Sequence, residues 1–200
     1  MSRKDVMIKI LTDSVASIPA DVAREAGIDV VTLFVNREGC EYADSEMDLD
    51  AFYADIYDMV DNIPTSSQPS QHTLEAVFEE AARAGDEVLG IFLSHELSGT
   101  WQCAKLAADL ANVDNVLFVD SATVCLGESL LVRLAVQLRD AGKTLVQIAT
   151  DLEHAKEHLH LVAAIDDLKY LRKGGRLPAA VAVAGGMLGI KPSSPSRTVR

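Results

Sequence analysis

Small hydroxyl side chains gather at two places where the sequence predicts that a helix begins. Residues 94–102 read SHELSGTWQ and follow the apolar run VLGIFL, while residues 64–70 read PTSSQPS and precede an amphipathic segment. The first N–H groups of a helix lack partners and carry partial positive charge, so a carboxylate or a phosphate binds there readily. A serine at such a position also caps the helix without any ligand. Two such junctions in one chain favour an anion site, and simple capping stays open for each.

A serine nucleophile is the alternative chemistry for the first junction. Ser94 and Ser98 are the candidates, and His95 adjoins Ser94. The G-x-S-x-G turn that exposes the serine of many hydrolases is absent. Neighbouring residues at a strand end also point to opposite sides as a rule. A small-molecule hydrolase or transferase built on Ser98 or Ser94 is therefore the second hypothesis, behind a binding protein that is not an enzyme.

Histidines and glycines provide weaker signals for a metal ion or a nucleotide. His154 and His158 share one face of a predicted helix and His160 follows, but Lys156 lies between them on a charged surface. A solvated helix face is the better interpretation. The glycine patterns that bind dinucleotides or nucleoside triphosphates are absent. We predict neither a metal nor a cofactor.

Composition excludes several classes of partner. The 200-residue chain has a formal net charge of -12, which disfavours binding to nucleic acid or to anionic lipid surfaces. Its three cysteines, Cys40, Cys103 and Cys125, show no CxxC spacing and indicate free thiols in a reducing compartment. The longest apolar run, residues 179–190, is shorter than the ~20 residues of a membrane span. These features predict a cytoplasmic protein.

Apolar runs that predict strands alternate with helical patterns, as in an α/β protein with a parallel sheet and helices on both faces. The predicted strands are 6–11, 28–35, 87–93, 115–120 and 159–165. The predicted helices are 19–26, 48–60, 71–85, 98–111, 128–141 and 144–159. Helix 98–111 is expected to bury Cys103, Leu106, Ala107 and Leu110.

The pattern changes near residue 166, where DDLKYLRKGGRLP carries a dense local charge. We therefore expect an N-terminal domain over 1–163 and the incomplete start of a second α/β domain over 164–200. About 40 residues are too few for an independent core of ordinary size. The polar, proline-interrupted tail SSPSRTVR is expected to be disordered.

Six short motifs, taken in order, resemble those of the DegV family of bacterial lipid-binding proteins. They are TDSVASIP (12–19), SSQPS (66–70), LSGTWQCA (97–104), VDSATVCLG (119–127), LKYLRKGGRL (168–177) and GMLGIKP (186–192). Each is weak alone, whereas their conserved order over residues 8–192 makes the resemblance specific. Family members are longer than this chain, so the resemblance implies a C-terminal domain that is truncated here.

The resemblance implies a protein that binds one long-chain fatty acid, such as palmitate, for lipid transport or fatty acid metabolism. The acyl chain would lie in an apolar tunnel between the two domains. The carboxylate would be held by the hydroxyls of Ser66 and Ser98 at helix starts, with Gly99 and Thr100 beside Ser98. Ser66 stands where the family has threonine, and Thr65, one position earlier, could substitute.

The resemblance also implies a protein partner. Some family members present the bound acid to a fatty-acid kinase. The basic stretch near the end of the chain would be the docking surface, and its charged residues are Lys169, Arg172, Lys173 and Arg176. Four positive charges so close together in an acidic chain fit an acidic partner, and a solvated turn stays open as the alternative.

Overall fold

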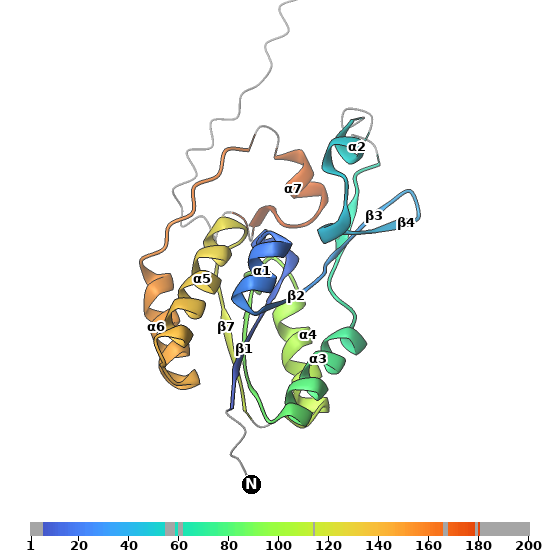
Figure 1. Ribbon diagram of the computed structural model, residues 1–200. Coiled ribbons are helices and arrows are strands. Elements are labelled where there is room, and N and C mark those ends of the chain that lie inside the picture. Colours follow the sequence, from blue (N-terminus) through green and yellow to red (C-terminus); the bar gives the residue numbers. More distant parts are fainter. Residues whose placement is uncertain are drawn as a thin grey trace, which may run out of the picture.

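The computed structural model describes residues 6–54, 59, 62–113, 115–165, 168–178 and 180. Four parallel strands form its central sheet in the order β2-β1-β6-β7 (Figure 1). Their bounds are Ile8–Asp13 (β1), Ile28–Val31 (β2), Glu87–Phe92 (β6) and Val116–Asp120 (β7). The chain moves from β1 to one side for β2 and to the other side for β6. This creates the switch point at which ligands bind in sheets of this kind.

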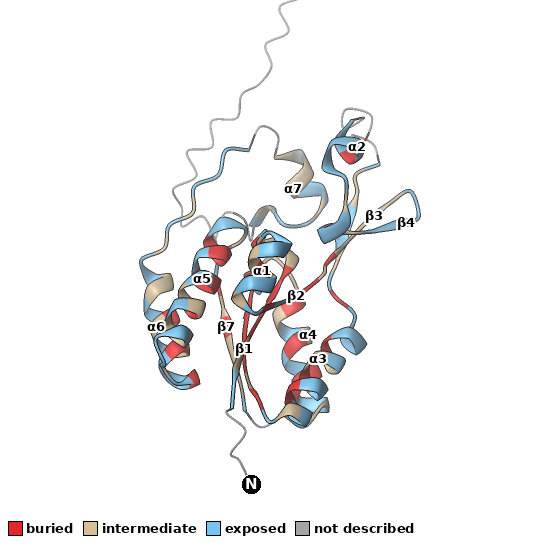
Figure 2. Cartoon of the chain, viewed as in Figure 1, coloured by how far each residue is buried: buried red, intermediate tan, exposed pale blue. Residues whose placement is uncertain are grey.

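Helices cover both faces of the sheet, so the predicted α/β architecture is confirmed. One face carries α1 (Ala20–Ala26), α5 (Leu126–Asp140) and α6 (Leu145–Glu157), and the other carries α3 (Gln71–Ala84) and α4 (Thr100–Leu110). Two hydrophobic clusters result, one on each side of the sheet. In Figure 2 the buried residues concentrate on the strands and on the helix faces that meet them. Because both faces are covered, β6 and β7 are nearly continuous apolar runs, while Lys9 interrupts β1 and Asp29 interrupts β2.

Local signals place several helix ends where the sequence predicts them. The Ser70 hydroxyl accepts a hydrogen bond from the Thr73 N–H at 3.0 Å, and Gly85 ends α3 in a left-handed conformation with φ of 75°. Thr144 and Gln147 form a reciprocal capping box at the start of α6. These side chains satisfy backbone groups that the helix itself leaves unpaired.

A small antiparallel sheet is absent from the sequence-based prediction. It consists of β3 (Phe34–Arg37), β4 (Cys40–Ala43) and β5 (Thr65–Ser67) in the order β4-β3-β5. The prediction of one strand over 28–35 is therefore wrong, because the chain leaves the parallel sheet after Val31. The Leu33 N–H donates to the Ser14 hydroxyl at 3.0 Å, and this bond turns the chain toward the second sheet.

Short helices lie in the connecting segments. η1 (Ser14–Ala16) follows β1, η2 (Asp44–Glu46) and α2 (Leu49–Tyr53) lie between β4 and β5, and α7 (Lys169–Lys173) follows α6. The predicted helix 48–60 corresponds to α2, and residues 55–58, 60 and 61 lie outside the described residues. The expected disordered tail, residues 193–200, also lies outside them.

The buried face of α4 differs from the prediction by one position. Leu106 and Leu110 are 51% and 54% exposed, and Cys103 is half-buried. The buried residues are Thr100, Ala104, Ala107 and Ala108. Small side chains let α4 lie close to the sheet and to α3, so close packing outweighs the larger apolar area of the leucines.

Residues 159–165 form no strand, contrary to the prediction. Alternate residues of this segment, Leu161, Ala163 and Ile165, line a cavity, while Val162 is 89% exposed. A period of two therefore arises here from a cavity wall and not from a sheet.

Gly90, in the middle of β6, is required by close packing against two aromatic rings. A Cβ atom at this position would lie 2.8 Å from the Phe92 ring and 2.9 Å from the Phe118 ring. We expect Gly90→Val to lower the free energy of unfolding by about 1–3 kcal/mol through overpacking, although valine favours strands. Denaturant unfolding measures this. Ala82→Val on the exposed side of α3 is the control, and equal stability of the two variants would contradict the packing argument.

Candidate functional site

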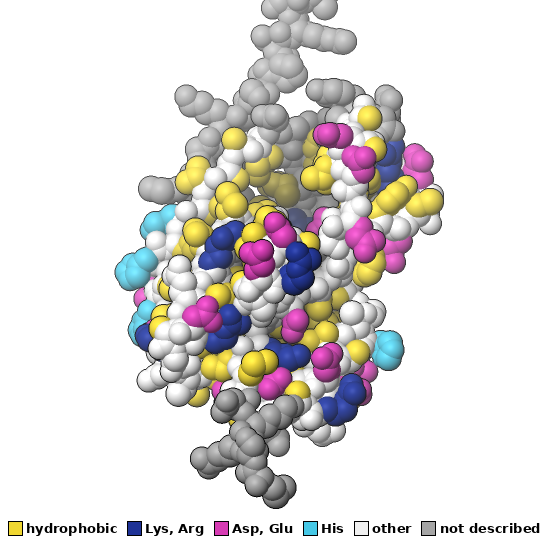
Figure 3. Space-filling model, in the orientation of Figure 1, with side chains coloured by type: hydrophobic (Ala, Val, Ile, Leu, Met, Phe, Trp, Pro, Cys, Tyr) yellow, Lys and Arg dark blue, Asp and Glu magenta, His cyan; other side chains and the backbone are white. Residues whose placement is uncertain are grey.

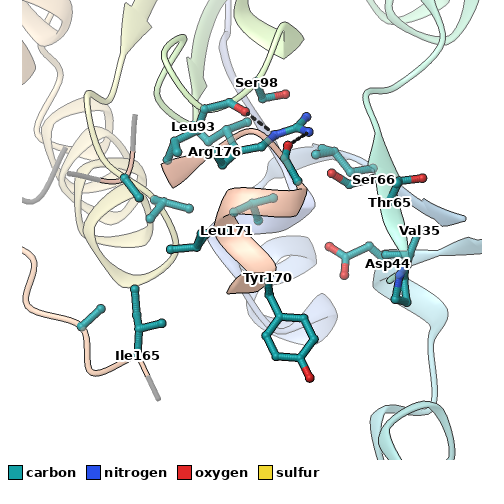
Figure 4. A pocket seen from close by; sticks show the side chains of 18 of the residues that line it. Val35, Asp44, Thr65, Ser66, Leu93, Ser98, Ile165, Tyr170, Leu171 and Arg176 are labelled. Atoms are coloured by element: carbon teal, nitrogen blue, oxygen red, sulfur yellow. Dashed lines mark hydrogen bonds between the residues drawn. The ribbon is translucent and has the colours of Figure 1, made fainter. Parts of the chain in front are cut away.

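A cavity of about 460 Å³ lies at the carboxyl edge of the parallel sheet. Its walls come from the ends of β1 and β6, from the small sheet, and from the segment between residues 161 and 180 (Figure 4). Most of the lining is aliphatic, and examples from each wall are Val15, Leu93, Val35, Leu161, Ile165 and Leu171. In Figure 3 yellow apolar side chains surround a hollow in the upper part of the molecule. Such a cavity suits an apolar ligand.

A few polar side chains complete the lining. Hydroxyls come from Thr65, Ser66, Ser98 and Tyr170, and the charged groups among the described lining residues are Asp44 and Arg176. Figure 4 places Ser98 and Arg176 at the top of the view, Ser66, Thr65 and Asp44 on its right-hand side, Tyr170 at the bottom and Ile165 at the lower left. The cavity is therefore amphipathic: its lining is mostly aliphatic and also carries a few hydroxyls, one cation and one carboxylate.

A tight turn after β6 positions Ser98. The N–H groups of Leu97 and Ser98 donate to the Ser94 carbonyl at 2.9 and 3.2 Å. The Ser98 hydroxyl lies 2.9 Å from the Thr100 hydroxyl and accepts a longer bond, 3.3 Å, from the Thr100 N–H. Ser98 thus lies just before Gly99, the N-cap residue of α4, and lines the cavity.

Gly99 and Thr100 lie next to Ser98, outside the described lining of the cavity. Thr100 is buried and bonds the Ser98 hydroxyl. A Cβ atom at Gly99 would come within 2.4 Å of the Gln68 amide oxygen, so the SSQPS and LSGT segments touch at this glycine. The structure therefore brings together the two motifs that the sequence singled out.

Ser66 and Thr65 reach the cavity from a strand and not from a helix start. Both belong to β5, where Ser66 pairs with Val35 of β3, and α3 begins only after Ser70. The prediction that both hydroxyls stand at helix starts is therefore wrong for this segment. PTSSQPS caps a helix through Ser70, while the earlier residues of the same segment add a strand to the small sheet.

Arg176 lines the cavity and is also exposed, whereas the sequence places it only with the basic cluster. Its Nε donates to the Leu97 carbonyl at 3.4 Å, and its Nη1 donates to the Gly174 carbonyl at 2.7 Å. The chain turns at Gly175, which has a φ of 74°, and this turn returns Arg176 toward Ser98. Arg172 and Lys173 are exposed on α7, and Lys169 begins that helix. The paired glycines after α7 are the sequence signal for this reversal.

The TDS motif, residues 12–14, holds several residues of the cavity lining in place through hydrogen bonds. Sequence reasoning missed this role. Each of the motif's three side chains bonds a different neighbour. Thr12 donates to Glu128 at 3.0 Å, Asp13 accepts from the N–H groups of Val15 and Leu93 at 2.9 and 3.0 Å, and Ser14 accepts from Leu33. Val15, Leu33 and Leu93 all line the cavity, so one short motif holds three of its walls.

The arrangement of His95 does not match a serine hydrolase. Its Nδ1 lies 2.5 Å from Asp120, whose hydrogen bond and negative charge raise the pKa of the imidazole. Ser94 is buried, and within the described part of the chain no hydrogen bond joins His95 to Ser94 or Ser98. The triad logic needs a base bonded to the nucleophile.

The other candidate sites are dispersed. His154, His158 and His160 are exposed, and no group of three or more metal-ligating side chains converges among the described residues. Cys40, Cys103 and Cys125 are free thiols. Over the same residues, every helix is too short or too polar to cross a bilayer.

Comparison with known proteins identifies the family. A model described as "Uncharacterised protein, DegV family" matches residues 7–193. A DegV domain-containing protein of Caldanaerobacter subterraneus is 32% identical over 186 residues, covering 92% of this chain and 66% of that protein. This chain thus spans slightly less than two thirds of the length of that relative.

Two solved structures agree with this assignment. A fatty-acid-binding DegV family protein from Thermus thermophilus superimposes with a TM-score of 0.77 at 32% identity, over 92% of this chain and 65% of that one. A stearic acid-binding protein from Eubacterium ventriosum gives a TM-score of 0.72 at 25% identity, over 92% and 64%. The chain therefore belongs to the DegV family.

Proposed function

We propose that this protein binds one long-chain fatty acid, with the acyl chain along the aliphatic walls of the cavity and the carboxylate at Ser98, Ser66 and Arg176. The observation that carries the proposal is a mostly aliphatic cavity whose lining also contains the hydroxyls of Ser98 and Ser66 and one arginine. The fatty-acid-binding relatives support it. In this assignment the protein is a carrier in the cytoplasm and not an enzyme.

Energetics assigns different roles to the two parts of the cavity. Each buried methylene contributes ~0.8 kcal/mol, so a palmitoyl chain supplies on the order of 10 kcal/mol before ordering costs. Each hydrogen bond to a charged group contributes about 1.5–3 kcal/mol. The aliphatic walls therefore determine affinity, whereas Ser98, Ser66 and Arg176 determine where the carboxylate lies. Asp44, a fixed negative charge in the lining, disfavours a carboxylate beside it.

The segment after residue 163 is proposed as the start of a domain that covers the lipid. Leu171, Gly174 and Arg176 already contribute one wall of the cavity. The exposed cations Arg172 and Lys173, with Lys169 on the same short helix, are proposed to dock an acidic fatty-acid kinase. The kinase would transfer a phosphoryl group to the carboxylate held nearby.

Native mass spectrometry of the purified protein tests the proposal. We expect a co-purified mass equal to that of palmitate or a fatty acid of similar length, released on denaturation. A protein that carries no lipid, fails to take up added palmitate and instead hydrolyses an ester or phosphate would disprove it.

Alanine substitutions test the carboxylate site. We expect Ser98→Ala and Ser66→Ala each to weaken palmitate binding roughly 10-fold or more, because each removes a hydrogen bond to a charged group. Ser67→Ala is the matched control, since Ser67 neighbours Ser66 on β5 and bonds Asn36 outside the cavity lining. His95→Ala is the second control. Retention of palmitate by all four variants equally would exclude the assigned site.

A further inference from the structure

Two carboxyl groups lie completely buried beneath the cavity. Asp13 ends β1 and Glu128 lies in the first turn of α5, and both side chains are 0% exposed. Both oxygens of Asp13 accept backbone N–H groups, whereas the Oε1 of Glu128 accepts the Thr12 hydroxyl at 3.0 Å. The Oε2 of Glu128 has no donor among the described residues. A buried carboxylate oxygen without a donor is costly, so this atom calls for an explanation.

A shared proton explains the lone oxygen. The two carboxyls hydrogen-bond each other, and two buried negative charges in contact cannot both persist. Burial, followed by the charge of Asp13, raises the pKa of Glu128 well above its ordinary value, and burial raises the pKa of Asp13 to about 6. The hydrogen bond between them raises the pKa of Glu128 and lowers that of Asp13, so Glu128 holds the shared proton and donates it to the Asp13 carboxylate.

The other titratable groups near the pair act in the same direction. Asp44 adds to the raised pKa of Asp13, and the Cys125 thiol, which precedes α5, faces the negative charges of Asp13, Glu128 and Asp44. Every charge that acts on the pair from the described residues is negative. No nearby cation substitutes for the proton, so its loss leaves two buried, repelling carboxylates.

The pair joins the elements that form the inner end of the cavity. Through Asp13 it holds Val15 after β1 and Leu93 at the end of β6, and both line the cavity. Leu93 opens the turn that carries Ser98. Through Glu128 it holds the first turn of α5, a helix that begins two residues after the lining residue Val124. Repulsion within the pair would therefore displace several walls of the cavity together.

We propose that Asp13 and Glu128 form a positioning pair whose single shared proton keeps the lipid cavity assembled, so that loss of this proton at alkaline pH releases the ligand. The pair acts through Val15, Leu93 and the Ser98 turn, and it does not touch the carboxylate site itself. This inference rests on the proposed fatty-acid binding, and its test separates the two.

The first measurement is the dissociation constant of a fluorescent long-chain fatty acid between about pH 6 and about pH 9. For the wild type we expect binding to weaken as the pH rises. Above the pKa at which the pair loses its shared proton, the dissociation constant should increase by up to about tenfold per pH unit. Glu128→Gln keeps a donor toward Asp13 and an acceptor for Thr12 but has no proton to lose. Its dissociation constant should therefore not increase at alkaline pH. Asp13→Asn places an amide donor against a backbone N–H and should weaken binding at every pH.

Asp86→Asn is the matched control. Asp86 is also buried and accepts a backbone N–H, but it lies at the opposite edge of the sheet. Its pH profile should match that of the wild type. The proposal would be overturned if wild-type binding did not weaken at alkaline pH, or if Glu128→Gln weakened there as the wild type does.

A second measurement does not depend on lipid. Infrared difference spectroscopy of the ligand-free protein at neutral pH should show a protonated carboxyl band that Glu128→Gln lacks. Suppose that neither the wild type nor any variant binds the fatty acid, but the wild type shows this band and Glu128→Gln lacks it. The proposed function is then wrong, whereas the shared proton is supported and has no role in lipid binding. If the band is the same in both proteins, the pair is refuted.

Discussion

Replacing Asp13 with alanine is expected to lower the free energy of unfolding by about 3 kcal/mol, because several buried polar groups lose their partners at once. The N–H groups of Val15 and Leu93 would have no acceptor, and Glu128 would have none for its proton. Each buried unpaired group costs about 1–3 kcal/mol, and removal of the costly buried carboxylate offsets part of that loss.

The pH dependence of this loss has a definite sign. Burial is the main reason that the pKa of Asp13 is raised to about 6. At pH values between its ordinary pKa and about 6, the folded protein therefore binds more protons than the unfolded chain. The stability contributed by Asp13 is therefore greatest below the unfolded pKa and falls as the pH rises through about 6. The difference between wild type and Asp13→Ala should be widest near pH 4 and narrower at pH 7.

Urea unfolding at several pH values measures both effects. Asp86→Ala is the control, because Asp86 accepts one long hydrogen bond of 3.3 Å from the Met7 N–H and should contribute less. A difference between wild type and Asp13→Ala that widens as the pH rises would contradict the raised pKa. Equal stability of the two proteins would contradict the hydrogen-bonding role.

Charge reversal at Arg176 is expected to have the largest effect on the ligand. Arg176 is the cation of the described cavity lining and bonds the Leu97 carbonyl beside Ser98. Arg176→Glu removes a charge-assisted hydrogen bond to the carboxylate, worth about 1.5–3 kcal/mol, and adds a repulsive charge close to it. We expect palmitate to bind at least roughly 100-fold more weakly.

A neutral ligand separates charge from packing in this experiment. The alcohol with the same chain length as palmitate has no charge to repel, so Arg176→Glu should bind it about as well as the wild type does. Arg83→Glu at the end of α3 is the control for a change in net charge, because Arg83 is exposed and remote from the cavity lining. Equal losses for the acid and the alcohol would indicate that Arg176 supports the wall and not the carboxylate.

Elements with strong local signals were predictable from the sequence. Ser70, Gly85 and Thr144 mark helix ends through caps that act within a few residues. The strands of the parallel sheet are rich in apolar residues because helices bury both faces of the sheet. Ser98 and Ser66 could be chosen as site residues because their motifs are specific in order, and both line the cavity.

Elements that depend on distant partners were not predictable in the same way. The strands of the small sheet are half-exposed and polar, so periodicity does not reveal them. The face of α4 was misjudged because apolar size favours Leu106 and Leu110, whereas close packing selects alanines. Arg176 is exposed like Arg172 and Lys173, and the turn at Gly175 directs it to the cavity, so the sequence does not distinguish it from them.

The sequence by itself therefore determined the α/β class, the positions of most helices and the two hydroxyl-bearing motifs, since these depend on periodicity and local capping. Only the tertiary structure decided how the cavity is assembled. Asp13 meets Leu93 across 80 positions, Thr12 meets Glu128 across 116, and Arg176 meets Leu97 across 79. No local pattern encodes such contacts, because they form only when the parallel strands bring their carboxyl ends to one edge. That edge brings a buried carboxyl pair, a serine turn and an arginine together around one amphipathic cavity.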